Sequence, residues 1–198
     1  MAYAGQTIGN PITGEQITFL ETTDDTRGER LLFDCLVRPD GIRLPPHVHS
    51  RQEERLEVLA GTLGVMRGDK VYTLRPGHKV VLPRRIKHQW WNAGRNEMKM
   101  RVQVTPPRHL EVVLEAMSVM AHEGKLRENA LPSSPFDLVH LLKLSETYTP
   151  QVPIWIQRIA LALGVSIGWL LGYDPDLKQY RSDSYEPLRM ERDRPNAA

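Results

Sequence analysis

The first half of the chain consists of short apolar runs separated by turn-forming residues. Between Gly41 and Pro107 these runs have roughly the five to eight residues that a strand needs. Four turn signals divide them: Ala60-Gly61, Arg67-Gly68-Asp69, Arg75-Pro76-Gly77 and Asn92-Ala93-Gly94. Upstream, residues 16–23 and 30–38 are rich in β-branched and aromatic side chains, and the turn between them predicts a hairpin. This rhythm predicts a mainly β fold, an antiparallel sandwich or barrel.

The hydrophobic period changes after Pro107. Residues 109–123 carry apolar side chains at helical spacing, and Gly124 would end that helix. A second helix is expected over residues 136–144, and a last apolar block covers 152–173. We therefore expect a barrel over residues 1–107 with an N-terminal arm over 1–15, a helical extension over 108–175 that packs on the barrel or on a dimer mate, and a mobile tail over 176–198.

Composition excludes several classes of protein. The 198 residues leave room for one ordinary domain and an appendage. The 26 basic and 24 acidic residues are spread along the chain, so no basic tract marks a surface for nucleic acid or lipid. The single cysteine, Cys35, excludes an internal disulfide framework, and the first residues lack the pattern of a signal peptide. We expect a cytoplasmic protein whose partner is a small molecule rather than nucleic acid or a membrane.

Four side chains of the metal-ligand type lie in two of the expected strands: His47, His49, Glu54 and His88. Because alternate residues of a strand face the same side, His47 and His49 point together. If these faces line the inside of a barrel, three imidazoles and a carboxylate converge. Such nitrogen and oxygen ligands suit Fe(II), Mn(II), Ni(II), Co(II) or Zn(II). The competing interpretation is that the pattern serves packing alone.

The same segments resemble the two signature motifs of the cupin superfamily. The first motif, G-x5-H-x-H-x4-E-x6-G, is met by Gly41, His47, His49, Glu54 and Gly61. The second, G-x5-P-x-G-x2-H-x3-N, is met by Gly77, Pro83, His88 and Asn92. Arg85 stands where the family usually has glycine. A turn with positive φ costs any other residue on the order of 1 kcal/mol, so we expect the loop before His88 to differ in shape.

The resemblance covers residues 17–107 and is to compact bacterial single-barrel members of the superfamily. It implies a jelly-roll (cupin) barrel, a homodimer, and a divalent transition metal held by the residues that match the four ligands. It fixes no reaction, because cupins include dioxygenases, decarboxylases, isomerases, lyases and binding modules.

From the site we expect a metal-dependent enzyme that acts on a small oxygenated or aromatic molecule. An oxidoreductase of dioxygenase type with Fe(II) is the first expectation. Glu54 is the expected catalytic residue, because the carboxylate doubles as a proton acceptor in some cupin dioxygenases. The alternatives are isomerase or lyase chemistry and a non-catalytic sensor or binding module.

The expected substrate pocket contains one aromatic and three smaller side chains: Trp90, Leu56, Val58 and Cys35. Trp90 shares a face with His88, whereas Trp91 should point outward. Glu53 should face away from Glu54 and pair with an arginine at position 51 or 55. Core packing is the competing role for both tryptophans.

The last apolar block admits three interpretations. Its uninterrupted apolar part, residues 159–173, is shorter than the ~20 residues that cross a bilayer. Glycines at positions 164, 168 and 172 would let another helix or the barrel wall approach closely, and packing against the barrel or a dimer mate is the favoured interpretation. The stretch 158–175 is also similar to the closing half of lambda-repressor-like helix-turn-helix domains, although no recognition helix is evident upstream.

Overall fold

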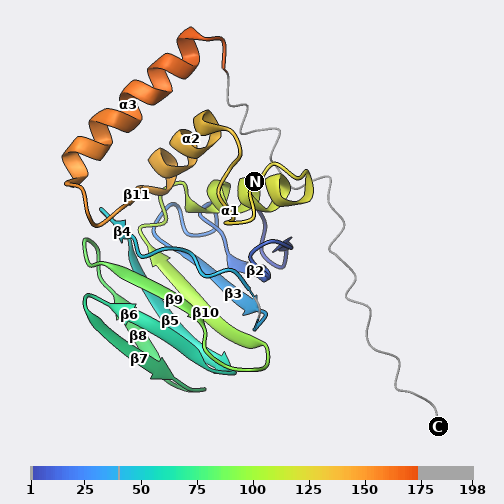
Figure 1. The fold of residues 1–198 in the computed structure, drawn as a ribbon. Coiled ribbons are helices and arrows are strands. Elements are labelled where there is room, and N and C mark those ends of the chain that lie inside the picture. Colours follow the sequence, from blue (N-terminus) through green and yellow to red (C-terminus); the bar gives the residue numbers. More distant parts are fainter. Residues whose placement is uncertain (1, 40, 174–198) are drawn as a thin grey trace.

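The computed structural model describes residues 2–39 and 41–173. Two facing β-sheets form the body of the molecule, and three helices lie together beyond one end of it (Figure 1). Every strand pair is antiparallel. The predicted mainly β fold with a C-terminal helical part is confirmed. The expected mobile tail over 176–198 lies outside the described residues.

The larger sheet has six strands in the order β1-β2-β3-β10-β5-β8. Their bounds are β1 Thr7–Asn10, β2 Glu15–Glu21, β3 Leu31–Val37, β10 Met98–Thr105, β5 Glu53–Ala60 and β8 Lys79–Leu82. The predicted hairpin is the β2–β3 pair. β1 was not predicted: it lies in the expected N-terminal arm, and Ile8 is the only one of its four residues that is buried.

The smaller sheet has three strands in the order β7-β6-β9. Their bounds are β7 Lys70–Leu74, β6 Leu63–Arg67 and β9 His88–Asn92. A bridge between His47 and His88 extends this sheet toward β4 (Val48–His49). β4 in turn pairs with β11 (Thr147–Tyr148), which comes from the helical part of the chain.

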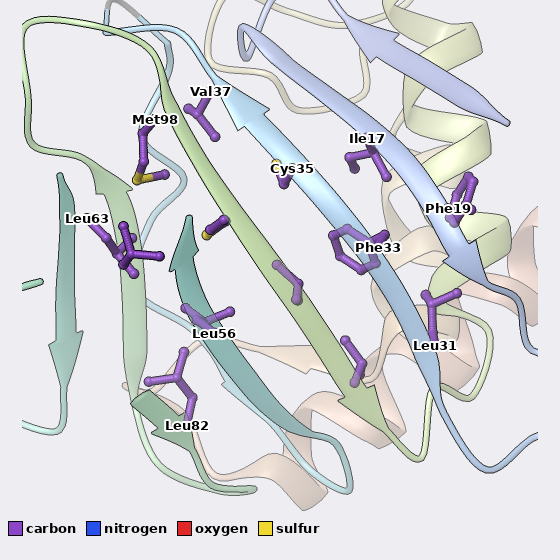
Figure 2. Close-up of a cluster of buried hydrophobic side chains, with 14 of the residues drawn as sticks. Ile17, Phe19, Leu31, Phe33, Cys35, Val37, Leu56, Leu63, Leu82 and Met98 are labelled. Atoms are coloured by element: carbon purple, nitrogen blue, oxygen red, sulfur yellow. The ribbon is translucent and has the colours of Figure 1, made fainter. Parts of the chain in front are cut away.

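The core fills the space between the sheets. Figure 2 shows side chains from β2, β3, β5, β6, β8 and β10 meeting there. Alternate residues of β5 and β10 are buried, as a half-buried strand requires. Fully buried members such as Phe19, Leu56 and Leu82 each contribute about 1.5–3 kcal/mol. Gly61 ends β5 with φ of 77°, and a Cβ there would lie 2.7 Å from the Glu97 carbonyl, so this motif glycine is required by the turn.

The helices are α1 (Leu110–His122), α2 (Pro135–Ser145) and α3 (Ile154–Leu170). The apolar side of α1 meets α2 in a second cluster around Met120 and Leu141. α3 lies against α2, where Gly164 and Gly168 approach Val139 and Phe136. Small residues therefore allow the close contact between these two helices, as their spacing suggests.

The described residues bear on two of the alternatives for the last apolar block. Within residues 2–39 and 41–173, no helix is long and apolar enough to cross a membrane. α3 is also one continuous helix of 17 residues, so the described part of the block contains no internal turn of the helix-turn-helix kind.

Candidate metal centre

Three histidines from neighbouring backbone segments meet at the end of the barrel nearest the helices. His47 and His49 flank the first residue of β4, and His88 begins β9. The main chains of His47 and His88 exchange two hydrogen bonds of 3.0 and 2.9 Å. The ring centroids lie 4.6–5.2 Å apart. One ring nitrogen of each residue lies within 4.8 Å of the others, a geometry that could hold a metal ion.

Each imidazole is fixed through its Nδ1 atom. His47 Nδ1 lies 3.0 Å from the Pro45 carbonyl oxygen, and His88 Nδ1 lies 2.8 Å from that of Ile86. His49 Nδ1 lies 3.4 Å from the hydroxyl oxygen of Thr147. A carbonyl oxygen can only accept, so Nδ1 of His47 and His88 carries the proton and Nε2 keeps its lone pair. This is the tautomer that a metal ligand needs.

Glu54 on β5 completes the group. Its Oε1 atom lies 3.2 Å from His49 Nε2, and its Oε2 atom lies 3.9 Å from His88 Nε2. Glu54 Oε2 and His88 Nε2 are buried and have no hydrogen-bond partner. Leaving such groups unpaired costs about 1–3 kcal/mol each, and a cation between them would satisfy both. The donor set therefore fits a divalent transition metal.

The pKa values agree with this fit. Burial lowers the pKa of His47 to about 4, helped by the neighbouring His49 and His88, and burial also lowers the pKa of His88. Burial alone would raise the pKa of Glu54, but the hydrogen bond with His49 and the nearby imidazoles outweigh it and lower that pKa to about 2. At neutral pH His47 and His88 are thus neutral imidazoles and Glu54 is a carboxylate, which are the ligating forms.

The comparison with protein families agrees with this geometry. Residues 33–105 match the family model described as "Cupin domain", and this range contains all four residues of the site. This segment is a cupin domain. The resemblance stated from the two motifs is confirmed.

Several solved structures have a similar fold, but their sequence identities are too low to indicate a reaction for the cupin domain. The cupin domain of Cnp3 from Schizosaccharomyces pombe is 10% identical, with a TM-score of 0.42 over 46% of this chain and 64% of that one, which is less than two thirds of its length. KdgF from Halomonas sp. is 19% identical, with a TM-score of 0.46 over 54% and 91%. The polyketide cyclase RemF from Streptomyces resistomycificus is 21% identical, with a TM-score of 0.44 over 53% and 78%. No match was found among proteins with curated descriptions.

The position where this cupin domain departs from the motif corrects one expectation. Arg85 itself takes the positive φ, 64°, that glycine would take, so the loop before His88 was wrongly expected to change its backbone shape. The Arg85 amide donates to the His49 carbonyl at 2.7 Å, which holds the strained residue in place. The loop is therefore tied to a residue of the metal centre.

A small cavity of about 20 Å³ opens beside the histidines of the cupin domain, enough for a water molecule. It is lined by Glu15, Val37, Gly41, Ile42, Leu44, His47, Gln89, Trp90, Trp91 and Asn92. Of the four expected pocket residues, Trp90 lies in this wall. The other three belong to the closed core and are at most 1% exposed: Leu56, Val58 and Cys35.

The structure also shows the surroundings of Trp91 and Glu53, which were both expected to point away from the site. Trp91 lies on the outer face of the smaller sheet, where its ring covers Gly64 and the Arg43 guanidinium stacks 3.4 Å above it. Glu53 pairs with Arg55 at 2.9 Å and faces away from the site, as expected.

Glu15 is a cavity residue that the sequence reasoning missed. It begins β2 in phase with the core residues Ile17 and Phe19, so its carboxylate points into the barrel. Burial raises the pKa of Glu15 to about 7, opposed by the hydrogen bond that the Thr13 hydroxyl donates at 2.9 Å. The available signal was an acidic residue directly before the predicted strand 16–23, in phase with the apolar residues of that strand.

Proposed function

We propose that the cupin domain is a metal-dependent enzyme that acts on a small oxygenated or aromatic molecule. The supporting observation is the group of three imidazoles fixed through Nδ1 beside a buried carboxylate. The proposed ligands are His47, His49, Glu54 and His88, and the proposed cofactor is Fe(II), with Mn(II), Ni(II), Co(II) or Zn(II) as alternatives. The first reaction class is oxidation of dioxygenase type.

The metal would polarise a bound oxygen atom of the substrate and, as Fe(II), would bring O₂ beside it. The protein's own residues hold the ring nitrogens in place and exclude water, since His49, Glu54 and His88 are at most 7% exposed. The side of His47 that faces the cavity is where a substrate would approach. Trp90 would supply an apolar wall for an aromatic or aliphatic part of that substrate.

Two carboxylates could accept the substrate's proton. Glu54 lies at the metal site, but its pKa of about 2 makes it a weak base at neutral pH. Glu15 lies in the same cavity as His47, and its pKa of about 7 matches neutral conditions. We propose Glu54 as ligand and first proton acceptor, with Glu15 as the competitor. Glu15→Gln with full metal content and lost turnover would assign the step to Glu15.

A second function is favoured by two observations. The cavity is too small for most substrates. In addition, β11 pairs the helical extension directly with the strand that carries His49. A sensor or binding module, in which ligand at the metal alters the helices, would use such a connection. Isomerase or lyase chemistry at the same site remains the alternative within enzymes.

The wider proposals follow from the rest of the chain. We propose the barrel at 1–107 and the extension at 108–175 as its two parts, with a homodimer as the assembled form. We also propose the cytoplasm as the compartment of the protein, in which the free thiol of Cys35 would stay reduced.

The test is to purify the protein with its native metal, measure the metal by mass spectrometry, and follow O₂ uptake with diketones, catechols and flavonols. The enzyme proposal expects uptake that His88→Ala abolishes. Metal binding without turnover of any substrate, together with saturable binding of the same compounds, would favour the sensor. Unchanged ligand binding by a metal-free His88→Ala variant would exclude both metal-dependent functions.

A further inference from the structure

The helical extension contributes directly to the surroundings of the metal centre. Two of the three imidazoles are oriented by main-chain carbonyls of the cupin domain, each two residues before its histidine. The third, His49, faces the hydroxyl of Thr147, which lies 98 residues further along the chain. Of the three groups that orient the imidazoles, two belong to the barrel, and only the Thr147 hydroxyl comes from the helical extension.

Backbone pairing places Thr147 opposite His49. In the β11–β4 pair, Thr147 faces His49 and Tyr148 faces Val48. The Ser50 amide donates to the Glu146 carbonyl at 3.4 Å, which continues the pairing by one residue. We call residues 146–148 the strap. Its register decides which side chain meets His49, because a slip of one residue would turn the Thr147 side chain to the other face.

Glu146 fixes the strap at that register. It ends α2 with φ of 50°, a conformation that reverses the chain toward β4. Its carboxylate accepts a hydrogen bond from the Ser50 hydroxyl. Three guanidinium groups lie 3.7–3.9 Å from this carboxylate, and they belong to Arg51 beside β4, Arg108 before α1 and Arg158 of α3. One largely buried carboxylate thus joins the barrel, the connection to α1, and both α2 and α3.

A group that hydrogen-bonds to the second ring nitrogen of a metal-binding histidine fixes the orientation of the ring and raises its basicity. Removing such a group typically costs 10–100-fold in metal affinity. We propose that the strap is part of the metal centre: Thr147 is a positioning residue that orients the His49 imidazole, and Glu146 holds Thr147 in register. This inference rests on the proposed metal-binding function. It also makes the helical extension necessary for full metal affinity.

The test measures Co(II) binding by the whole 198-residue chain, because the visible absorption of Co(II) reports the geometry of its ligands. Thr147→Val removes the hydroxyl but keeps the shape and the β11 backbone. We expect it to weaken Co(II) binding about 10-fold and to change the absorption spectrum. Thr147→Ser should restore both the affinity and the spectrum, because it restores the oxygen. Thr149→Val, an exposed position in the same segment, is the matched control and should match wild type.

The outcomes separate this inference from the proposed function. If the wild type does not bind Co(II), or if His88→Ala binds it equally well, the metal-site proposal fails. If the wild type binds Co(II) in a His88-dependent manner and Thr147→Val has the wild-type affinity and spectrum, the role of the strap is wrong. Should Thr147→Val not fold, Thr147→Ala and Glu146→Gln provide the same comparison, with Glu146→Gln expected to weaken binding by several-fold.

Discussion

Two carboxylates of the barrel differ in pKa because they have different neighbours. Glu54 lies between imidazoles that stabilise its anion, whereas Glu15 has only a neutral hydroxyl beside it. Among the described residues no basic side chain forms a salt bridge with Glu15. Burial therefore dominates at Glu15, and its proton is held up to about pH 7.

This difference predicts a pH-dependent stability for Glu15. Its pKa is near 4.5 in the unfolded chain and about 7 in the folded one, so its contribution is fully present below pH 4.5 and is lost as the pH rises through 7. Glu15→Gln cannot ionise. Wild type should therefore lose stability as Glu15 ionises, whereas the variant should not. In the metal-free proteins, the free energy of unfolding of the variant minus that of wild type should increase by up to about 3 kcal/mol from pH 4.5 to pH 8.

Urea denaturation of both proteins at several pH values, with a chelator present, measures this gain. Other titrating groups cancel in the comparison because both chains contain them. A difference between the two proteins that stays constant from pH 4.5 to 8 would contradict the raised pKa.

The Arg85 backbone leads to a second prediction at this scale. A non-glycine residue at positive φ costs about 1–2 kcal/mol, and glycine's extra freedom when unfolded costs about 0.5–1 kcal/mol. Arg85→Gly should therefore raise the free energy of unfolding by up to about 1 kcal/mol. Arg84→Gly, at an ordinary φ, is the control and should lower it by about 0.5–1 kcal/mol. Equal effects in urea denaturation would show that Arg85 is unstrained.

The sequence indicated the three histidines that the structure brings together, and Glu54 beside them, because histidine and glutamate are distinctive and strand alternation gives their direction. It did not predict Thr147, because threonine is common and its contact with His49 depends on tertiary pairing. Glu15 was within reach of the same alternation that identified Glu54, although the expected strand began one residue after it.

At the scale of elements, long alternating strands such as β5 and β10 were predictable from their own side chains. β4 and β11 have two residues each, and only their pairing defines them. The first helix followed from helical spacing and from Gly124 at its end, the second was expected over residues 136–144, and the third lies in the last apolar block. The packing of α3 against α2 could not be predicted from the sequence, because the side chains of an apolar helix do not identify the surface that covers them.

α3 presents an apolar ridge away from α2. Trp155, Ile159, Leu163 and Ile167 recur every four residues and are 51–65% exposed. Residues at this spacing form the ridges by which two helices commonly pack. We expect the proposed homodimer to form through this ridge. In a two-fold arrangement the ridge of one copy packs against the same ridge of the other, and both become buried.

The double substitution Ile159→Glu with Leu163→Glu should convert such a dimer into a monomer, since charges cannot be buried there without partners. Light scattering after size-exclusion chromatography measures the mass. Thr73→Glu adds charge to an exposed position of β7, away from α3, and should leave the dimer intact. A monomeric wild type, or a dimer that survives the double substitution, would contradict this interface.

At the scale of the whole molecule, the cupin domain and the extension meet at the candidate site. The barrel supplies the imidazoles and the carboxylate, and the extension pairs with β4 through β11 (Figure 1). The fold class and the existence of the two parts could be read from the change in hydrophobic period. Their junction could not, because it depends on one short strand and on the charges around Glu146.

The measurement closest to the central claim is the number and affinity of Co(II) ions bound per chain, determined by calorimetry in wild type and in His88→Ala. We predict one ion per wild-type chain and a loss of affinity of more than ~100-fold in His88→Ala, a larger loss than removing a group behind a ligand would cause. His78→Ala removes an exposed histidine outside the site and should bind like wild type. Equal binding by wild type and His88→Ala, or no binding by either, would contradict the metal centre.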